Sequence, residues 1–127
     1  MARAERIAAE RWGRLAEWLA ALVLQMKGYR ILARRVRTSS GEIDLIARRG
    51  DTFAFIEVKA RGTVEDALDA VSESSWQRIS NCAEIWAARH MPAGDFGWRY
   101  DLVAICPWKW PKHLRDAWRP DFALTMT

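Results

Sequence analysis

Cysteine and histidine are scarce in this chain, which has two of each among its 127 residues. Cys82 and Cys106 do not form the paired spacing of a zinc site, and two cysteines are too few for a disulfide framework. We therefore expect both to be small buried apolar residues of a protein kept in a reducing compartment. His90 and His113 also have no partner at metal-ligand spacing, and we interpret them as structural or surface residues.

Long apolar runs are also missing. The longest is Trp18 to Leu24, far short of the roughly 20 residues that a membrane helix needs. The first six residues contain Arg3, Glu5 and Arg6 and lack the apolar stretch of a signal peptide. These absences predict a cytoplasmic protein that does not associate with membranes.

Tryptophan and positive charge are abundant. Eight tryptophans and a hydrophobic content of 50% are enough for a core, so we expect a single domain over residues 1–127. Residues 1–62 hold 13 Lys and Arg against 7 Asp and Glu, whereas residues 63–127 hold 7 against 9. A basic half favours a polyanionic partner such as nucleic acid, and ordinary solubility charge remains an open alternative.

The periodicity of apolar residues predicts the order of helices and strands. A helix is expected over residues 3–27, with an apolar stripe of Ala8, Trp12, Leu15, Ala16, Leu19, Leu22, Val23 and Met26. Strands are expected over residues 29–37, 42–48, 52–60 and 98–106. A short helix is expected over 64–71, and a long one from a capping box at Ser74 to His90. The order predicts an α/β fold with a mixed sheet and helices packed on it.

Acidic residues lie in two of these strands where a sheet usually carries apolar side chains. A tight turn centred on Gly50 and Asp51 joins the two strands. Pairing counted outward from the turn sets Asp44 opposite Glu57, and residues two apart share one face. We therefore expect Glu42, Asp44, Glu57 and Lys59 on a common face. Opposed Cβ atoms lie about 4.5–5.5 Å apart, so the two carboxylates repel each other unless a cation compensates them.

Two acids beside a lysine suggest a metal site for phosphodiester chemistry. Mg²⁺ binds hard oxygen ligands, often one or two carboxylates, and keeps several waters. Such an ion polarises phosphate and lowers the pKa of a bound water, while Lys59 would orient that water or neutralise developing charge. A surface hairpin whose acids pair with Lys59 and nearby arginines is the alternative that the residues leave open.

The order Gly41-Glu42-Ile43-Asp44, hairpin, Glu57-Val58-Lys59 resembles the PD-(D/E)XK nuclease superfamily. The chain resembles more closely the small bacterial YraN family, whose members are predicted endonucleases of that superfamily. The similarity extends through Gly28-Tyr29-Arg30 and Arg99-Tyr100-Asp101. It implies a restriction-endonuclease-like mixed β-sheet core flanked by helices, and hydrolysis of DNA or structured nucleic acid. Many nucleases of the superfamily act as dimers, so the resemblance also implies a homodimer.

The resemblance also implies roles for single residues. Asp44 and Glu57 would bind Mg²⁺ or Mn²⁺ with the backbone carbonyl of Val58, and Lys59 would be the catalytic lysine. Glu17 matches an acid on the first helix that often completes the site. The helical pattern places Glu17 away from the apolar stripe, so a solvated glutamate is an equal alternative. Candidate nucleic-acid contacts are Arg34, Arg35 and Arg48 around the hairpin, and Gln77 and Arg78 near the start of the second helix.

Two other functions remain open. One is a nucleic-acid-binding module with little or no catalysis. The other is a protein-interaction domain that docks through the Trp-rich segment containing Trp108, Trp110 and Trp118. Aromatic residues interleaved with Lys109 and Lys112 can stack on bases, although clustered tryptophans more often pack in a core or an interface.

Overall fold

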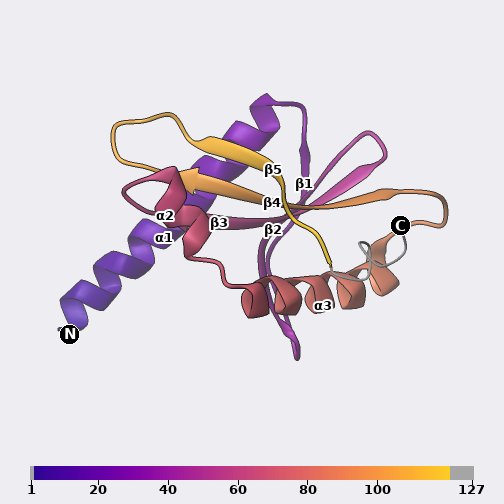
Figure 1. Ribbon diagram of the computed structural model, residues 1–127, viewed down its shortest axis with the longest axis horizontal. Helices are drawn as coiled ribbons and strands as arrows, with labels where there is room; N and C mark the ends of the chain where they lie inside the picture. The colour runs from indigo at the N-terminus through magenta and orange to yellow at the C-terminus, as the bar shows by residue number, and fades with distance from the viewer. Residues whose placement is uncertain (1, 121–127) are drawn as a thin grey trace.

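Five strands and three helices make up the computed structural model, which describes residues 2–120. The elements are α1 (Arg3–Met26), β1 (Arg30–Thr38), β2 (Gly41–Arg49), β3 (Thr52–Ala60), α2 (Val64–Asp69), α3 (Glu73–His90), β4 (Gly97–Ile105) and β5 (Lys112–Trp118). All five strands belong to one sheet, in which their spatial order follows the order of the chain (Figure 1).

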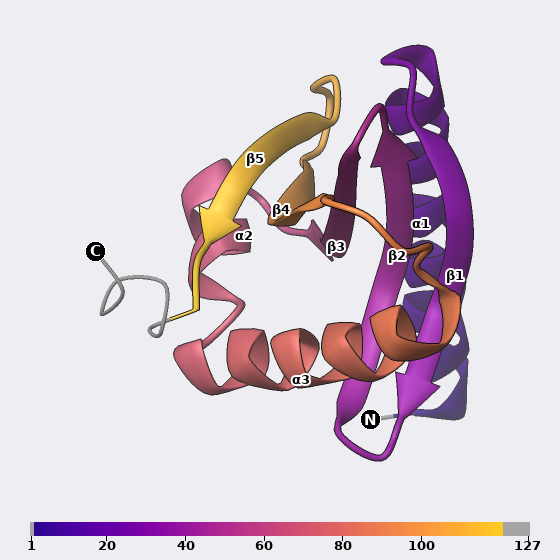
Figure 2. The same ribbon diagram turned by 90° about the vertical axis from the view of Figure 1, so that its right-hand side faces the viewer.

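The sheet is mixed but mostly antiparallel. β1 pairs with β2, β2 with β3, and β4 with β5 in antiparallel fashion, whereas β3 and β4 are parallel. Parallel neighbours need a long crossover, and this one contains α2 and α3. α1 lies along one face of the sheet, and α3 packs across β1 and β2 on the other (Figures 1 and 2). The expected α/β class is confirmed, and the architecture is consistent with a restriction-endonuclease-like fold.

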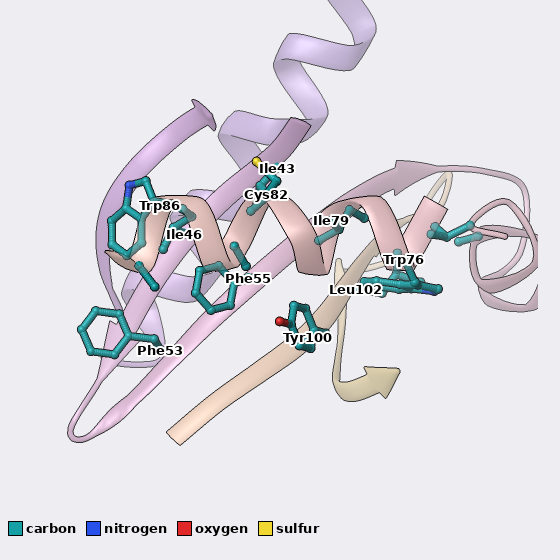
Figure 3. Close-up of a cluster of buried hydrophobic side chains, with 14 of the residues drawn as sticks. Ile43, Ile46, Phe53, Phe55, Trp76, Ile79, Cys82, Trp86, Tyr100 and Leu102 are labelled. Atoms are coloured by element: carbon teal, nitrogen blue, oxygen red, sulfur yellow. The ribbon is translucent and has the colours of Figure 1, made fainter. Parts of the chain in front are cut away.

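Each face of the sheet buries its own core. The core under α3 contains the large aromatic side chains, among them Phe53, Phe55 and Trp86 (Figure 3). The core under α1 is built from smaller side chains, among them Ala54 and Ile56. β3 is therefore covered on both sides. Full burial of a side chain such as Phe or Ile contributes roughly 1.5–3 kcal/mol, so β3 is the best-anchored strand near the two acids.

The face of α1 that packs on the sheet is not the expected stripe. Its buried residues are Ala16, Ala20, Ala21, Val23 and Leu24. Most of the large side chains of the expected stripe are exposed instead, including Trp12, Leu15, Leu22 and Met26. Small alanines let the helix approach the sheet closely, which bulky tryptophans would prevent. The expectation for this helix face was therefore wrong, although its bounds were close.

Other expectations are corrected at the start of α3 and in the Trp-rich segment. The N-cap of α3 is Ser72, whose hydroxyl accepts a hydrogen bond from the Ser75 N–H at 3.1 Å, and not Ser74. β5 was not expected at all. Its last residue, Trp118, stacks on Trp76 with ring centroids 6.1 Å apart.

Two expected features of the chain agree with the structure. Cys82 and Cys106 are free and buried. In the part of the chain that the structure describes, no helix has both the length and the apolar character needed to span a membrane.

Candidate active site

The turn between β2 and β3 sets the register of the site. Gly50 adopts φ +60°, and Arg49 and Thr52 pair directly across the turn, which fits the type II′ turn expected for a two-residue loop that begins with glycine. The pairing continues without a shift to Leu45 and Ile56. The register expected from the sequence is therefore confirmed up to Leu45 and Ile56, the residues next to Asp44 and Glu57.

Beyond Leu45 the backbone ladder of β2 and β3 gives way to a side-chain contact. The carboxylate of Asp44 accepts a hydrogen bond from the backbone N–H of Val58 at 2.8 Å. This contact fixes Asp44 against β3, because the N–H that it satisfies belongs to the residue directly after Glu57. Val58 thus contacts Asp44 through its backbone N–H, which donates the hydrogen bond.

The alternation of side chains along β2 is interrupted around Asp44. Leu45 belongs to the core under α1, whereas Ile43 and Ile46 both belong to the core under α3. On the neighbouring strand, Arg35 adopts a left-handed φ of +50° at the same level. Such irregularities re-aim side chains, and this one gives the two acids of β2 different surroundings.

Asp44 and Glu42 consequently line different hollows. Asp44 lies in a hollow of about 380 Å³ between α1 and the end of β3, together with Glu17. Glu42 lies in a smaller one of about 160 Å³ beside α3. Glu57 and Lys59 line both. The expectation that all four strand residues share one face was therefore wrong for Glu42, because the chain is distorted between Ile43 and Leu45.

The larger hollow, which we call the acid hollow, brings together four of the residues singled out from the sequence. Its lining includes Glu17 from α1, Asp44 from β2, and Glu57 and Lys59 from β3, with small residues of α1 forming the opposite wall. Lys59 Nζ lies 3.9 Å from Glu57 Oε1, and its side chain is 28% exposed. The acids are thus enclosed by the helix while the lysine amine remains in contact with solvent.

Glu57 has a strongly raised pKa in the acid hollow. Burial raises its pKa from an ordinary value near 4.5 to about 9, and the hydrogen bond and negative charge of Asp44 act in the same direction. The positive charge of Lys59 opposes the increase without cancelling it. At neutral pH Glu57 therefore holds a proton, as expected for a carboxyl group in a poorly solvated site beside a negative charge.

Glu17 lies at the acid hollow but is engaged elsewhere. It accepts a hydrogen bond from Nε of Arg35 at 2.7 Å, and its side chain is 21% exposed. This hydrogen bond is the main cause of the raised pKa of Arg35. Within residues 2–120, no three His, Cys, Asp or Glu side chains gather as metal ligands. Asp44 and Glu57 are then the two carboxylates that could bind a metal. Two carboxylate ligands are enough for Mg²⁺ when waters complete its coordination shell.

Comparison with known proteins places the chain in a family. The model of the uncharacterised protein family UPF0102 matches residues 16–105. The chain belongs to the UPF0102 family. A UPF0102 protein of Mesorhizobium japonicum is 52% identical over 90% of this chain and 91% of its own length. Another, of Maricaulis maris, is 51% identical over 94% of each chain. The resemblance to the YraN family, which is the UPF0102 family, is confirmed, whereas membership of the PD-(D/E)XK superfamily stays a prediction.

The UPF0102 match covers Glu17, the hairpin acids and Arg78, but it ends before β5. All candidate site residues therefore lie in the part of the chain that the family model describes. Trp108 and Trp110 lie outside it and are 102% and 70% exposed. Docking through this segment stays a prediction.

The candidate nucleic-acid contacts lie in different places. Arg35 is at the acid hollow through Glu17, and Arg78 lines the smaller hollow beside Glu42. Arg34 is exposed on β1. Arg48 instead lies over the ring of Phe53 near the β2–β3 turn, with its guanidinium carbon 5.2 Å from the ring centroid. Gln77 is exposed and bonds to Asn81 within α3. The structure therefore brings Arg35 and Arg78, but not Arg48, near the acids.

A cluster of hydrogen-bonded polar side chains, which was not predicted from the sequence, links β4 to β5. Asp101 is fully buried and accepts hydrogen bonds from Arg99 and from His113 Nε2, each at 2.8 Å. Burial would raise the pKa of Asp101, but these bonds and one from the backbone of Asp116 lower it to about 2. Arg99 also donates to the hydroxyl of Tyr29. No spacing in the sequence pointed to the contact of His113 with Asp101.

Proposed function

We propose that this UPF0102 protein is a metal-dependent nuclease of the PD-(D/E)XK superfamily, acting on DNA or structured nucleic acid. One observation carries the proposal. Asp44, Glu57 and Lys59 line one hollow against α1, and the pKa of Glu57 is raised to about 9 by burial and by Asp44. A buried acidic pair of this kind is unfavourable for folding unless it has a use, and holding a divalent cation is the use that fits two carboxylates.

Asp44 and Glu57 would hold Mg²⁺ or Mn²⁺ in place of the proton on Glu57. The bond from Val58 N–H at 2.8 Å holds the carboxylate of Asp44 in position, and the remaining lone pairs are available for coordination. The cation would polarise the scissile phosphate and lower the pKa of an attacking water. Ligand binding would then compete with protonation, so the affinity for metal should rise with pH.

Lys59 has the place of the catalytic lysine in this proposal. Its amine lies 3.9 Å from Glu57 and is partly exposed, so it can reach a phosphate oxygen or water above the acids. A fixed positive charge at that point stabilises the charge that develops on the phosphate. Arg35, held by Glu17 at the edge of the acid hollow, would contact a neighbouring phosphate.

The test is a cleavage panel of linear, flapped, branched and single-stranded DNA with Mg²⁺ or Mn²⁺. We expect at least one substrate to be cut, and Lys59→Ala to lose the activity. Arg89→Ala, which removes an exposed positive charge at the end of α3, is the control and should cut like wild type. Absence of cleavage on every substrate would refute the nuclease proposal.

The metal site has a separate test that does not require a substrate. Millimolar Mg²⁺ or Mn²⁺ should raise the melting temperature of the wild-type protein, because a ligand that binds the folded state stabilises it. Asp44→Asn should abolish the increase, whereas Asp51→Asn in the exposed turn should keep it. An equal response in wild type and Asp44→Asn would show that the metal acts elsewhere.

A second candidate function is a nucleic-acid-binding module without cleavage. It is favoured by the bond between Glu17 and Arg35, which keeps the helix acid away from the other two carboxylates. A module of this kind would bind DNA with an affinity that falls steeply with salt, and it would never cut. The cleavage panel and a salt titration together separate the two functions.

A further inference from the structure

The outward face of α1 carries an apolar stripe that no described part of the chain covers. We call it the outer stripe. Its members and their exposed fractions are Ile7 36%, Trp12 46%, Leu15 46%, Trp18 55%, Leu22 38% and Met26 66%. They recur at intervals of three to five residues along one side of the helix. Exposed apolar side chains that stand singly are ordinary, but a contiguous stripe marks an interaction site.

The packing of α1 explains why the outer stripe is left over. The helix contacts the sheet through Ala16, Ala20 and Leu24, on the opposite side of its axis. Figure 2 shows α1 running along the back of β1 and β2, so its far side points away from the protein. Over residues 18–24 the helix is apolar on every side, an arrangement typical of a buried helix, and here only one side is buried within the chain.

The sizes of the side chains along the stripe change from one end to the other. Leu22 and Met26 lie near its C-terminal end, and Trp12 and Trp18 lie nearer its middle. At the same helical spacing as Leu22 and Met26, the N-terminal end carries Ala4 and Ala8, which are exposed and small. Two copies of α1 packed antiparallel would set Leu22 and Met26 of one copy against Ala8 and Ala4 of the other. Interdigitation of this kind gives a well-filled helix interface.

The charges on α1 favour the same direction. Its N-terminal half contains four arginines and two glutamates, namely Arg3, Arg6, Arg11, Arg14, Glu5 and Glu10. A parallel pair would place these basic halves together, whereas an antiparallel pair separates them. The two helix dipoles also oppose each other in the antiparallel pair, which is favourable.

We propose that the outer stripe binds a second copy of this chain, forming a two-fold symmetric dimer in which the two α1 helices pack antiparallel. Half-exposed tryptophans present roughly 100 Å² each, and the whole stripe presents on the order of 500 Å² per copy. The total of about 1,000 Å² lies at the lower end of specific interfaces, so the dimer should dissociate on dilution. Trp12 also lines the acid hollow, so the partner helix would lie at the rim of each site.

The self-association is tested by sedimentation velocity over a range of concentrations. Wild type should shift from monomer to dimer as concentration rises. Trp18→Arg should raise the dissociation constant at least ~10-fold, as expected for a central aromatic residue of an interface. The control is Trp108→Arg, a change at a fully exposed tryptophan of the β4–β5 connection, and it should behave like wild type. Both substituted side chains are exposed, and circular dichroism checks that both variants fold.

The direction of packing is tested with cysteines and a short bismaleimide cross-linker, because the native cysteines are buried. In the antiparallel dimer, Ala8→Cys protein mixed with Leu22→Cys protein should give a covalent dimer. Leu22→Cys alone should not, since the two substituted positions would lie at least ~20 Å apart along the helix axis. The reverse result would indicate parallel packing and overturn the proposed arrangement.

The remaining outcomes decide against the proposal. A wild-type protein that stays monomeric at every concentration tested would overturn it. So would dimerisation that Trp18→Arg leaves unchanged, because the interface would then lie elsewhere. Co-sedimentation of wild type, but not Trp18→Arg, with anionic lipid vesicles, without dimerisation, would assign the stripe to a membrane surface. The inference does not depend on nuclease activity, so the metal-shift and cleavage tests can fail while this one succeeds.

Discussion

Replacement of Glu57 by glutamine tests the electrostatics of the acid hollow directly. The pKa of Glu57 is raised to about 9 in the folded protein from an ordinary value near 4.5. The folded state thus holds a proton that the unfolded chain releases, and the free energy of unfolding should fall as pH rises between these two values. Glutamine cannot titrate, yet its amide can still donate a hydrogen bond to Asp44 as the protonated acid does.

The size of the effect follows from the shift. One proton contributes ~1.4 kcal/mol for each pH unit in this window, so wild type should lose about 3 kcal/mol between pH 6 and pH 8. One kcal/mol corresponds to about 4 °C in a chain of this length. The melting temperature of Glu57→Gln, measured relative to that of wild type, should therefore rise by roughly 10 °C between pH 6 and pH 8. The comparison of two proteins at each pH cancels the other titrating groups.

The assay is differential scanning fluorimetry in EDTA at several pH values. Glu65→Gln, at an exposed position near the edge of the crossover, is the control and should follow wild type. Addition of Mg²⁺ at pH 8 should reduce the difference in melting temperature between Glu57→Gln and wild type, because only wild type keeps both carboxylate ligands. A melting temperature that has the same pH dependence in Glu57→Gln and wild type would refute the raised pKa of Glu57.

Three further predictions concern stability. Asp101→Asn should destabilise the fold by about 3 kcal/mol, because it leaves the half-buried Arg99 without its counter-charge. Since the pKa of Asp101 is lowered to about 2, the stability that it contributes is present above pH ~3.8 and is lost as pH falls towards 2, which acid unfolding of wild type and variant will reveal. Gly41→Ala should lower the free energy of unfolding in urea by at least ~1 kcal/mol, because Gly41 has φ +154° and an added Cβ would lie 3.3 Å from a side-chain atom of α3. Gly13→Ala on α1 should instead raise it by ~0.5–1 kcal/mol, because no atom lies within 4 Å of the added Cβ. Ser72→Ala should lower the free energy of unfolding by ~1 kcal/mol, because the α3 N-cap is lost, and Ser74→Ala should lower it clearly less. Equal decreases for the two variants would contradict Ser72 as the N-cap.

The sequence sufficed to predict the hairpin because its register is a local property. The turn at Gly50 and Asp51 fixes which residues pair, and the pairing of Leu45 with Ile56 follows by counting. The helix bounds were predictable for the same reason, since the apolar period and Gly28 lie close together in the chain. These local signals carried the prediction that Asp44 lies beside Glu57.

Features that depend on distant parts of the chain were not predictable. The buried face of α1 could not be chosen, because large and small apolar residues surround most of its circumference and only the sheet selects the alanines. Arg35 holds Glu17 through a contact between β1 and α1, which no spacing encodes. β5 was missed because its pattern is not alternating, and Asp116 has a left-handed φ of +58° within it.

The order of strands in the sheet has a consequence for folding. β1, β2 and β3 form two successive hairpins, so their contacts are local and require little loop closure. The parallel pairing of β3 with β4 must wait until the crossover of residues 61–96 has been laid down. Asp44, Glu57 and Lys59 all belong to the hairpins, whereas the aromatic core under α3 depends on the crossover. The three candidate site residues would therefore meet early on the folding route, and the rise in the pKa of Glu57 would depend on the packing of α1 over them.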